Sequence, residues 1–119
     1  MKVAVTSQGP DLESPVDVRF GRAKCFVMVD TDTGESHVLD NSQNLEAAQG
    51  AGVQAGQIVA QAGVEAVITG NVGPKAFRVL KAAGLKIYLA RQGTVKEAVE
   101  AFQAGELREV SEATVEGHW

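Results

Sequence analysis

The sequence predicts an α/β domain in which helices cover both faces of a mixed five-stranded sheet. Short runs of apolar, β-branched residues alternate with segments whose apolar residues recur at helical spacing. Alanine-glycine pairs at 62–63, 83–84 and 104–105 recur at a constant interval, as consecutive helix-strand units of equal length would produce. The 119 residues, 45% of them hydrophobic and 22% charged, suit one domain that buries its own core.

The first half of the sheet is expected to come from one strand and one hairpin. Lys2–Thr6 is apolar and β-branched and ends at a Ser-Gln-Gly-Pro loop, so it predicts the first strand. The extended runs Cys25–Val29 and His37–Leu39 flank the turn-forming sequence 30–35, which predicts an antiparallel hairpin. The loop between them, Ser7–Arg22, has the length and the glycine and proline content of a functional loop.

The second half is expected to repeat a helix-strand unit. We expect helices over 55–62, 74–84 and 95–102, and buried strands over 64–69 and 85–90. Pro74 suits the first position of the second helix, and Thr94-Val95-Lys96-Glu97 is a capping box that begins the third. Right-handed crossovers make the strands near residues 3, 67 and 87 parallel to one another.

Composition and motif content argue against several classes of protein. A net charge of -4 provides no positive field for nucleic acid, and the apolar run Val3–Val5 is too short for a signal peptide or a membrane span. We therefore expect a cytoplasmic protein that binds neither nucleic acid nor membrane. Asp11, Glu13 and Asp17 lack the histidine partners and spacing of a hydrolytic site, so no enzyme is expected.

The sequence assigns no metal site. Its one cysteine, Cys25, and His118 are the candidate ligands that we retain. The simpler interpretations are that Cys25 is a small buried side chain, that His118 belongs to a terminal tail, and that His37 is solvated on the hairpin.

Loops that follow parallel strands point to a ligand cleft at the carboxyl edge of the sheet. Three of them are expected to meet there, namely Ser7–Arg22, Gly70–Pro74 and Arg91–Gly93, with the 41–52 stretch as a possible border. The glycines of 70–75 lead into a helix N-terminus, where backbone N–H groups could cradle an anion. The alternative is a tight turn that uses glycine for geometry alone.

Two guanidinium groups, those of Arg19 and Arg22, surround a glycine in the long loop. Such a pair suits bidentate contact with phosphate, carboxylate or a charged cluster. The alternative is a solvated, charged loop with one buried aromatic residue, Phe20.

Several segments together resemble the dinitrogenase iron-molybdenum cofactor biosynthesis family, the NifX-type domain that is also found at the end of the NifB protein. These segments are KVAVTS, VDVRFGRAKCFVMVD, Gly50-Ala51-Gly52, GVEAVITGNVGPKAFRVLKAAGLKIYLA and TVKEAVEAFQAGEL. They extend from Lys2 to about Leu107 in the family's order. We accordingly expect a single NifX-like domain over 1–110 and a C-terminal tail over 111–119.

The resemblance implies a three-layer, ribonuclease H-like fold and, as in nitrogen-fixation members, a non-catalytic carrier or storage role. The cargo would be an iron-sulfur cluster, the iron-molybdenum cofactor or its precursor, exchanged with cofactor-assembly proteins by a monomer or homodimer. The family's FGRA and G-N-[IV]-G-P motifs, with the preceding arginine, place the cofactor-binding residues at Arg19, Phe20, Gly21, Arg22, Gly70, Asn71, Val72 and Gly73.

One departure from the family bears on how a cofactor would be held. Family members often carry histidine where this chain has Arg19. A cluster would then be held through few covalent ligands, shared across a dimer, or retained by charge and hydrogen bonds. The first strand lacks the carboxylates of a ribonuclease H mechanism. The alternative function is a regulatory or interaction module that binds a nucleotide or another small anion without metal.

Overall fold

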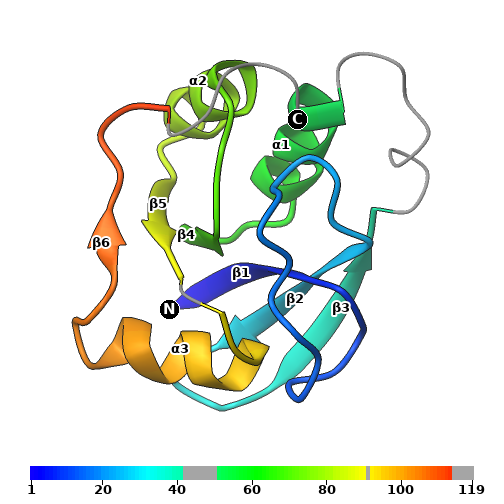
Figure 1. Cartoon of the computed structure of the whole chain (residues 1–119), viewed down its shortest axis with the longest axis vertical. Coiled ribbons are helices and arrows are strands. Elements are labelled where there is room, and N and C mark those ends of the chain that lie inside the picture. The colour runs from blue at the N-terminus through cyan, green and yellow to red at the C-terminus, as the bar shows by residue number, and fades with distance from the viewer. Residues whose placement is uncertain (42–50, 91, 114–119) are drawn as a thin grey trace.

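The computed structural model describes residues 1–41, 51–90 and 92–113 (Figure 1). The described chain forms, in order, β1 (Lys2–Ser7), β2 (Cys25–Asp30), β3 (Ser36–Asp40), α1 (Ala51–Gln61), β4 (Ala66–Thr69), α2 (Pro74–Ala82), β5 (Lys86–Leu89), α3 (Val95–Gln103) and β6 (Arg108–Glu109). No helix in these residues has both the length and the apolar character needed to cross a bilayer.

The strands form one mixed sheet in the order β3-β2-β1-β4-β5-β6. β1, β4 and β5 are parallel, whereas the β2–β3 hairpin extends the sheet antiparallel to β1. The predicted mixed sheet is confirmed, with one addition. β6 contributes two residues that pair antiparallel with Tyr88 and Leu89 of β5, and a segment this short leaves no periodic signal in the sequence.

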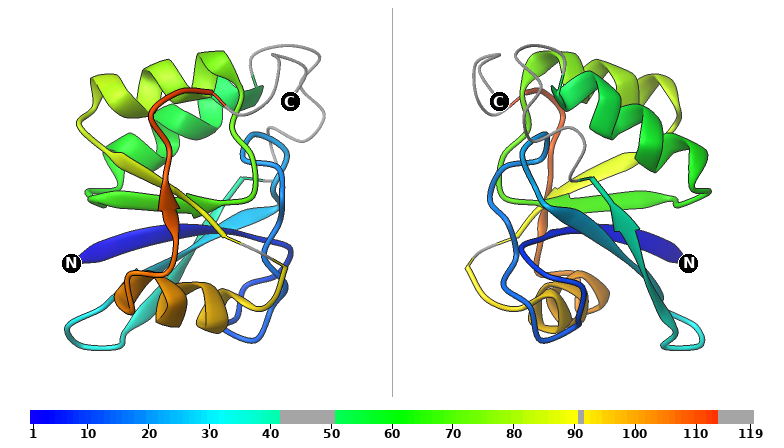
Figure 2. Two further views of the ribbon diagram at one scale, coloured as in Figure 1. Left: turned by 60° about the vertical axis from the view of Figure 1, so that its left-hand side comes forward. Right: turned by 90° about the vertical axis from the view of Figure 1, so that its right-hand side faces the viewer.

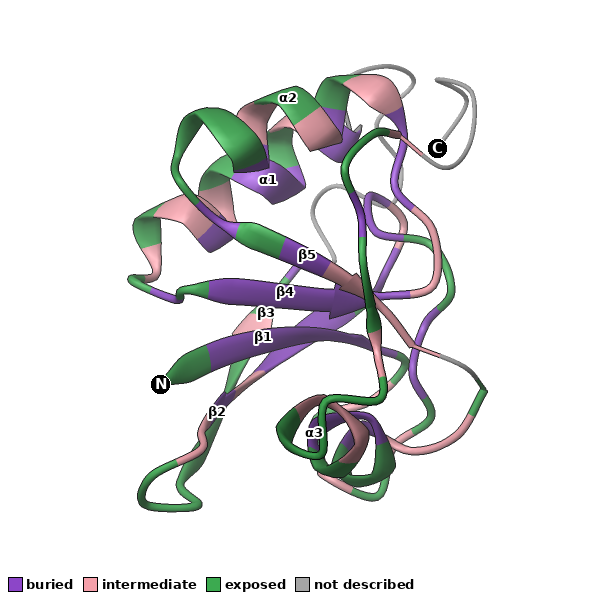
Figure 3. Ribbon diagram, turned by 90° about the vertical axis from the view of Figure 1, so that its left-hand side faces the viewer, coloured by how far each residue is buried: buried purple, intermediate pink, exposed green. Residues whose placement is uncertain are grey.

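The predicted three layers are confirmed. α1 and α2 lie together on one face of the sheet and α3 lies on the other (Figure 2). β1 and β4 run through the middle and are buried along almost their whole length (Figure 3). Two cores result, because alternate side chains of a strand point to opposite faces. Val59 and Leu80 belong to the core under α1 and α2, and Val5, Ile68 and Val99 belong to the core under α3.

The recurring glycines end the helices. Gly63, Gly84 and Gly105 have φ values of 78°, 81° and 74°, in the left-handed region that glycine adopts without steric cost. The constant interval between them therefore reflects three successive helix ends. α1 begins at Ala51, one turn before the predicted start, because the apolar spacing is clear only from Ala55 onward.

We expect Thr94→Ala to lower the free energy of unfolding by about 1 kcal/mol, the usual cost of losing an N-cap side chain. The Thr94 side chain accepts a hydrogen bond from Glu97 N at 3.1 Å, and the Glu97 carboxylate accepts one from Thr94 N at 2.9 Å. Urea unfolding measures the change. Thr94→Ser, which keeps the hydroxyl, is the control, and an equal loss in both variants would contradict the capping role.

Candidate functional site

The long loop lies across the carboxyl edge of the parallel strands, between the two other loops that were expected there (Figure 2). Its first half is joined to the start of α3, where Val16 N donates to Gly93 O at 2.9 Å. Its second half is joined to the turn after β4, where Phe20 N donates to Asn71 O at 3.2 Å. The predicted convergence of these loops is therefore present in the fold.

Buried polar groups attach the loop to the strand ends. The Thr6 hydroxyl donates to Asp17 O at 2.6 Å and is hydrogen-bonded to the Thr69 hydroxyl at 3.0 Å. Asp17 N in turn donates to Thr6 O at 2.9 Å. Both threonines are fully buried, so these bonds form away from competing water. These hydrogen bonds fix the position of Asp17 relative to the sheet.

Asp17 orients Arg19. The buried Asp17 carboxylate accepts a hydrogen bond from Arg19 N at 2.9 Å, and its Oδ1 lies 3.5 Å from Arg19 Nε. The Arg19 side chain is nevertheless 51% exposed. One edge of the guanidinium is thus held by the protein while the group remains accessible to a ligand.

A hollow of about 370 Å³ lies beside this loop, and we call it the cationic hollow. Its described lining residues are Gln8, Asp17, Arg19, Arg22 and Lys24. Three positively charged side chains and one carboxylate thus line the hollow, although the net charge of the whole chain is -4. Cations that line one concave site concentrate a positive potential locally, so an anion would be favoured here although the chain as a whole is acidic.

Asn41 holds the far end of the long loop. Its fully buried side chain donates from Nδ2 to Ala23 O at 2.8 Å, and Asn41 N donates to Lys24 O at 3.0 Å. These contacts place Lys24 at the hollow. Sequence reasoning placed Gln8 and Asn41 in segments expected at the cleft but singled out neither of them, and it missed Lys24, which directly precedes β2.

The predicted binding residues separate into three groups. Arg19 and Arg22 line the cationic hollow. Phe20 and Val72 are fully buried members of the core under α1 and α2. The backbone of the 70–73 turn supports the long loop.

The turn itself is not part of the cationic hollow. Residues 70–73 are absent from its described lining, and Asn71 contributes its carbonyl oxygen to the long loop. Gly21 is buried beside Phe20, and Gly73 is the N-cap of α2, without a side-chain cap. A binding role for the backbone of these glycines stays a prediction.

Gly70 permits the closest approach between the two loops. A Cβ atom at this position would lie 2.6 Å from Val18 Cα and 2.8 Å from Val18 O, both of them backbone atoms. Since backbone cannot rotate away as a flexible side chain can, any larger residue at 70 must displace the long loop.

We expect Gly70→Ala to lower the free energy of unfolding by about 1–3 kcal/mol and also to move Arg19 from its place. Gly84→Ala is the control, because Gly84 has a φ of 81° but no atom within 4 Å of the added Cβ. The control should lose stability through backbone strain alone. Urea unfolding and anion binding are measured for both variants, and unchanged binding in Gly70→Ala would contradict the loop's role.

Cys25, the first residue of β2, is buried beside the start of the long loop. Its Sγ donates to Gly9 O at 3.1 Å. Burial raises the pKa of the Cys25 thiol above its ordinary value of 9.0, and the nearby Asp40 carboxylate raises it further. Because a thiolate is the form that binds metals, this environment favours the packing role over the ligand role.

We expect native Cys25 to react with iodoacetamide much more slowly than the same residue in urea, with a half-maximal rate above pH 9.0. Mass spectrometry of samples quenched at intervals measures the rate. Rapid native alkylation at pH 7 would contradict the buried, protonated thiol.

Several other residues considered in the sequence are exposed or lie outside the described part of the chain. His37 is exposed on β3, whereas His118, Arg91 and most of the 41–52 stretch lie outside the described residues. In the described parts of the chain, no group of three or more His, Cys, Asp or Glu side chains could hold a metal ion.

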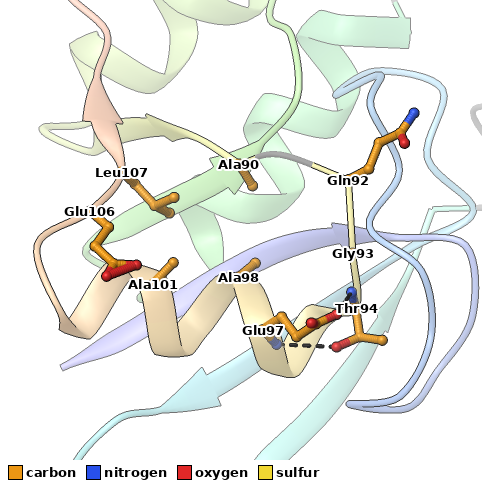
Figure 4. Close-up of a pocket in the computed structure, with 9 residues that line it drawn as sticks. All are labelled: Ala90, Gln92, Gly93, Thr94, Glu97, Ala98, Ala101, Glu106 and Leu107. Atoms are coloured by element: carbon orange, nitrogen blue, oxygen red, sulfur yellow. Dashed lines mark hydrogen bonds between the residues drawn. The ribbon is translucent and has the colours of Figure 1, made fainter.

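A second hollow, of about 400 Å³, lies beside α3 and has the opposite electrostatic character (Figure 4). It is lined by Ala90, Gln92, Gly93, Thr94, Glu97, Ala98, Ala101, Glu106 and Leu107. Two carboxylates and no cation occur among these described residues. An anionic ligand is therefore expected at the cationic hollow and not here.

Comparison with known proteins agrees with the architecture. The family model described as dinitrogenase iron-molybdenum cofactor matches residues 1–105. The apo form of the orange protein from Desulfovibrio gigas superposes with a TM-score of 0.93 at 40% identity, covering 96% of each chain. A putative NifB protein from Thermotoga superposes with a TM-score of 0.85 at 44% identity, covering 98% of each chain.

A further relative found by sequence spans a similar length. An uncharacterized protein from Methanocaldococcus jannaschii is 30% identical over 110 residues, which cover 90% of this chain and 89% of the relative. The resemblance therefore extends through the long loop, the 70–74 turn and the helices that position them.

Proposed function

Because this chain belongs to the dinitrogenase iron-molybdenum cofactor family, we propose that it is a non-catalytic carrier of an anionic metal-sulfur cofactor or its precursor. The cargo binds at the cationic hollow. The observation that carries this proposal is the concentration of Arg19, Arg22 and Lys24 in one hollow of an otherwise acidic protein.

The hollow suits retention by charge and hydrogen bonds. Each guanidinium offers several N–H donors in a rigid plane, which can bind the outer sulfur or oxygen atoms of a cluster. The volume of about 370 Å³ falls within the range of small-molecule sites. Cys25 is a buried thiol with a raised pKa, so the described residues support outer-atom contacts better than direct bonds to the metal.

Exposure of the hollow suits a carrier. Arg19 and Lys24 are exposed at its rim, so bound cargo would stay accessible to another protein. A carrier has to release its cargo to a cofactor-assembly protein, and electrostatic retention at a surface permits exchange without breaking metal–ligand bonds. The monomer and the homodimer are both compatible with a site formed by a single chain.

Anaerobic reconstitution with iron, sulfide and molybdate, followed by desalting, tests the proposal. We expect the protein to retain metal and to gain charge-transfer absorption in the visible range. Retention should decrease as salt rises from about 0.05 M to about 1 M, since salt screens exposed charges. A protein that retains no metal at low salt would contradict the proposal.

A metal-free role in binding a nucleotide or another small anion is the second candidate. It is favoured by the same guanidinium pair, because phosphate accepts bidentate hydrogen bonds as a cluster would. Calorimetry against a nucleotide panel in chelator-treated buffer separates the two candidates. Saturable micromolar binding, about -8 kcal/mol, would favour the nucleotide role.

A further inference from the structure

β3 forms one edge of the sheet, and its outer side is not paired with any described strand (Figure 2). The strand pairs with β2 in continuous register from Ser36 to Asp40, without a bulge. Its sequence, Ser-His-Val-Leu-Asp, contains no proline, lysine or arginine. Proline, lysine and bulges commonly prevent an edge strand from pairing with another chain, and the one acidic residue of β3, Asp40, lies at its end.

Backbone hydrogen bonds show which groups of β3 point outward. Asn41 N donates to Lys24 O and Asp30 N donates to Glu35 O, so positions 41 and 35 face β2. Pairs that exchange hydrogen bonds alternate with pairs that do not along an antiparallel ladder. Positions 37 and 39 therefore also face β2, whereas the N–H and C=O groups of positions 36 and 38 point away from it.

An apolar side chain lies at the centre of this edge. Val38 is 51% exposed, yet its partner across the ladder, Val27, is fully buried in the core under α3. The two side chains share one face of the sheet. α3 covers that face as far as β2, and the apolar surface continues to Val38 without cover from the described residues.

We propose that β3 pairs antiparallel with β3 of a second copy of this chain, about a two-fold axis at Val38. The strand is self-complementary in this register, with Val38 opposite Val38, His37 opposite Leu39 and Ser36 opposite Asp40. The outward groups of Val38 then form a reciprocal hydrogen-bonded pair. In one neighbouring register Asp40 would lie opposite Val38, and in the other the two His37 residues would lie opposite each other. The centred register avoids both pairs and is therefore favoured.

This pairing is independent of the proposed function. None of the described residues that line the cationic hollow belongs to β3. Loss of pairing should therefore leave cargo retention unchanged, and failure of cargo binding would not affect the expected dimer.

Sedimentation equilibrium of the whole chain tests the pairing. We expect the mean mass to rise from 12.5 kDa toward the mass of two chains, with half-dimerisation below about 1 mM chain. Val38→Lys, which places like charges opposite each other, should raise the dissociation constant about tenfold or more. Val18→Lys is the control at another exposed valine and should dimerise as the parent does.

Amide hydrogen exchange of the unaltered chain gives a second measurement that does not depend on a variant. The Val38 amide should exchange more slowly as concentration rises, whereas the His37 and Leu39 amides, which face β2, should change little. A constant mass up to about 1 mM, or a Val38→Lys chain that dimerises as tightly as the parent, would overturn the proposal.

Discussion

An Arg19→Ala, Arg22→Ala variant is expected to retain the proposed metal-sulfur cargo about 100-fold more weakly than the parent protein. Hydrogen bonds to charged groups contribute about 1.5–3 kcal/mol each, and each 1.4 kcal/mol changes an equilibrium constant tenfold. Both guanidinium groups line the cationic hollow, so their combined loss would remove one proposed contact to the cargo from each. Metal content after desalting, measured over a range of cargo concentrations, gives the change in affinity.

Two matched variants separate site chemistry from net charge. Arg78→Ala, Lys81→Ala removes the same charge from exposed positions on α2 and should retain cargo as the parent does. Arg19→Lys, Arg22→Lys keeps the charge but loses the planar donor array, so we expect intermediate affinity. Equal losses of cargo affinity in the 19/22 and 78/81 alanine variants would show that only the net charge of the protein matters. That result would contradict a specific role for Arg19 and Arg22.

Phe20→Ala is expected to lower the free energy of unfolding by about 3–5 kcal/mol, as is usual for a large aromatic side chain deleted from a core. Phe20 is only 1% exposed, and its ring centroid lies 5.5 Å from that of Phe26. The side chain therefore anchors the long loop to the sheet, and its loss would leave a cavity in the core under α1 and α2. Urea unfolding measures the difference.

Phe77→Ala provides the comparison for Phe20. Phe77 is half-buried on α2 and packs at the margin of the same core, so the same truncation should cost less. Similar losses at both positions, or a loss below about 1.5 kcal/mol for Phe20→Ala, would contradict the anchoring role.

The sequence was sufficient to predict most of the architecture because local signals agree with the fold. Val3–Val5 and Ala66–Thr69 are continuous apolar runs, which a strand buried on both faces requires. The Thr94 capping box and Pro74 begin their helices as predicted. The sixth strand was missed because Arg108–Glu109 has neither an apolar run nor alternation, and its pairing depends on β5.

Parts of the site could not be predicted because they depend on contacts between segments distant in the sequence. Asn41 reaches back to Ala23, and Thr6 meets both Asp17 and Thr69 only after the sheet has formed. Glycine at 70 suits an anion cradle and a close packing contact equally well in sequence. The structure adds that Val18 occupies the space that a Cβ at 70 would need, so packing requires glycine there, while the anion cradle stays a prediction.

The most direct test is to map where the cargo binds. Backbone amide NMR spectra of the 15N-labelled protein would be compared before and after anaerobic loading. We expect changes in position or line width to concentrate in residues 17–24, with Gln8 and the 70–73 turn affected next. Changes centred instead on Ala98 and Ala101, in the acidic hollow beside α3, would contradict a binding site at the cationic hollow.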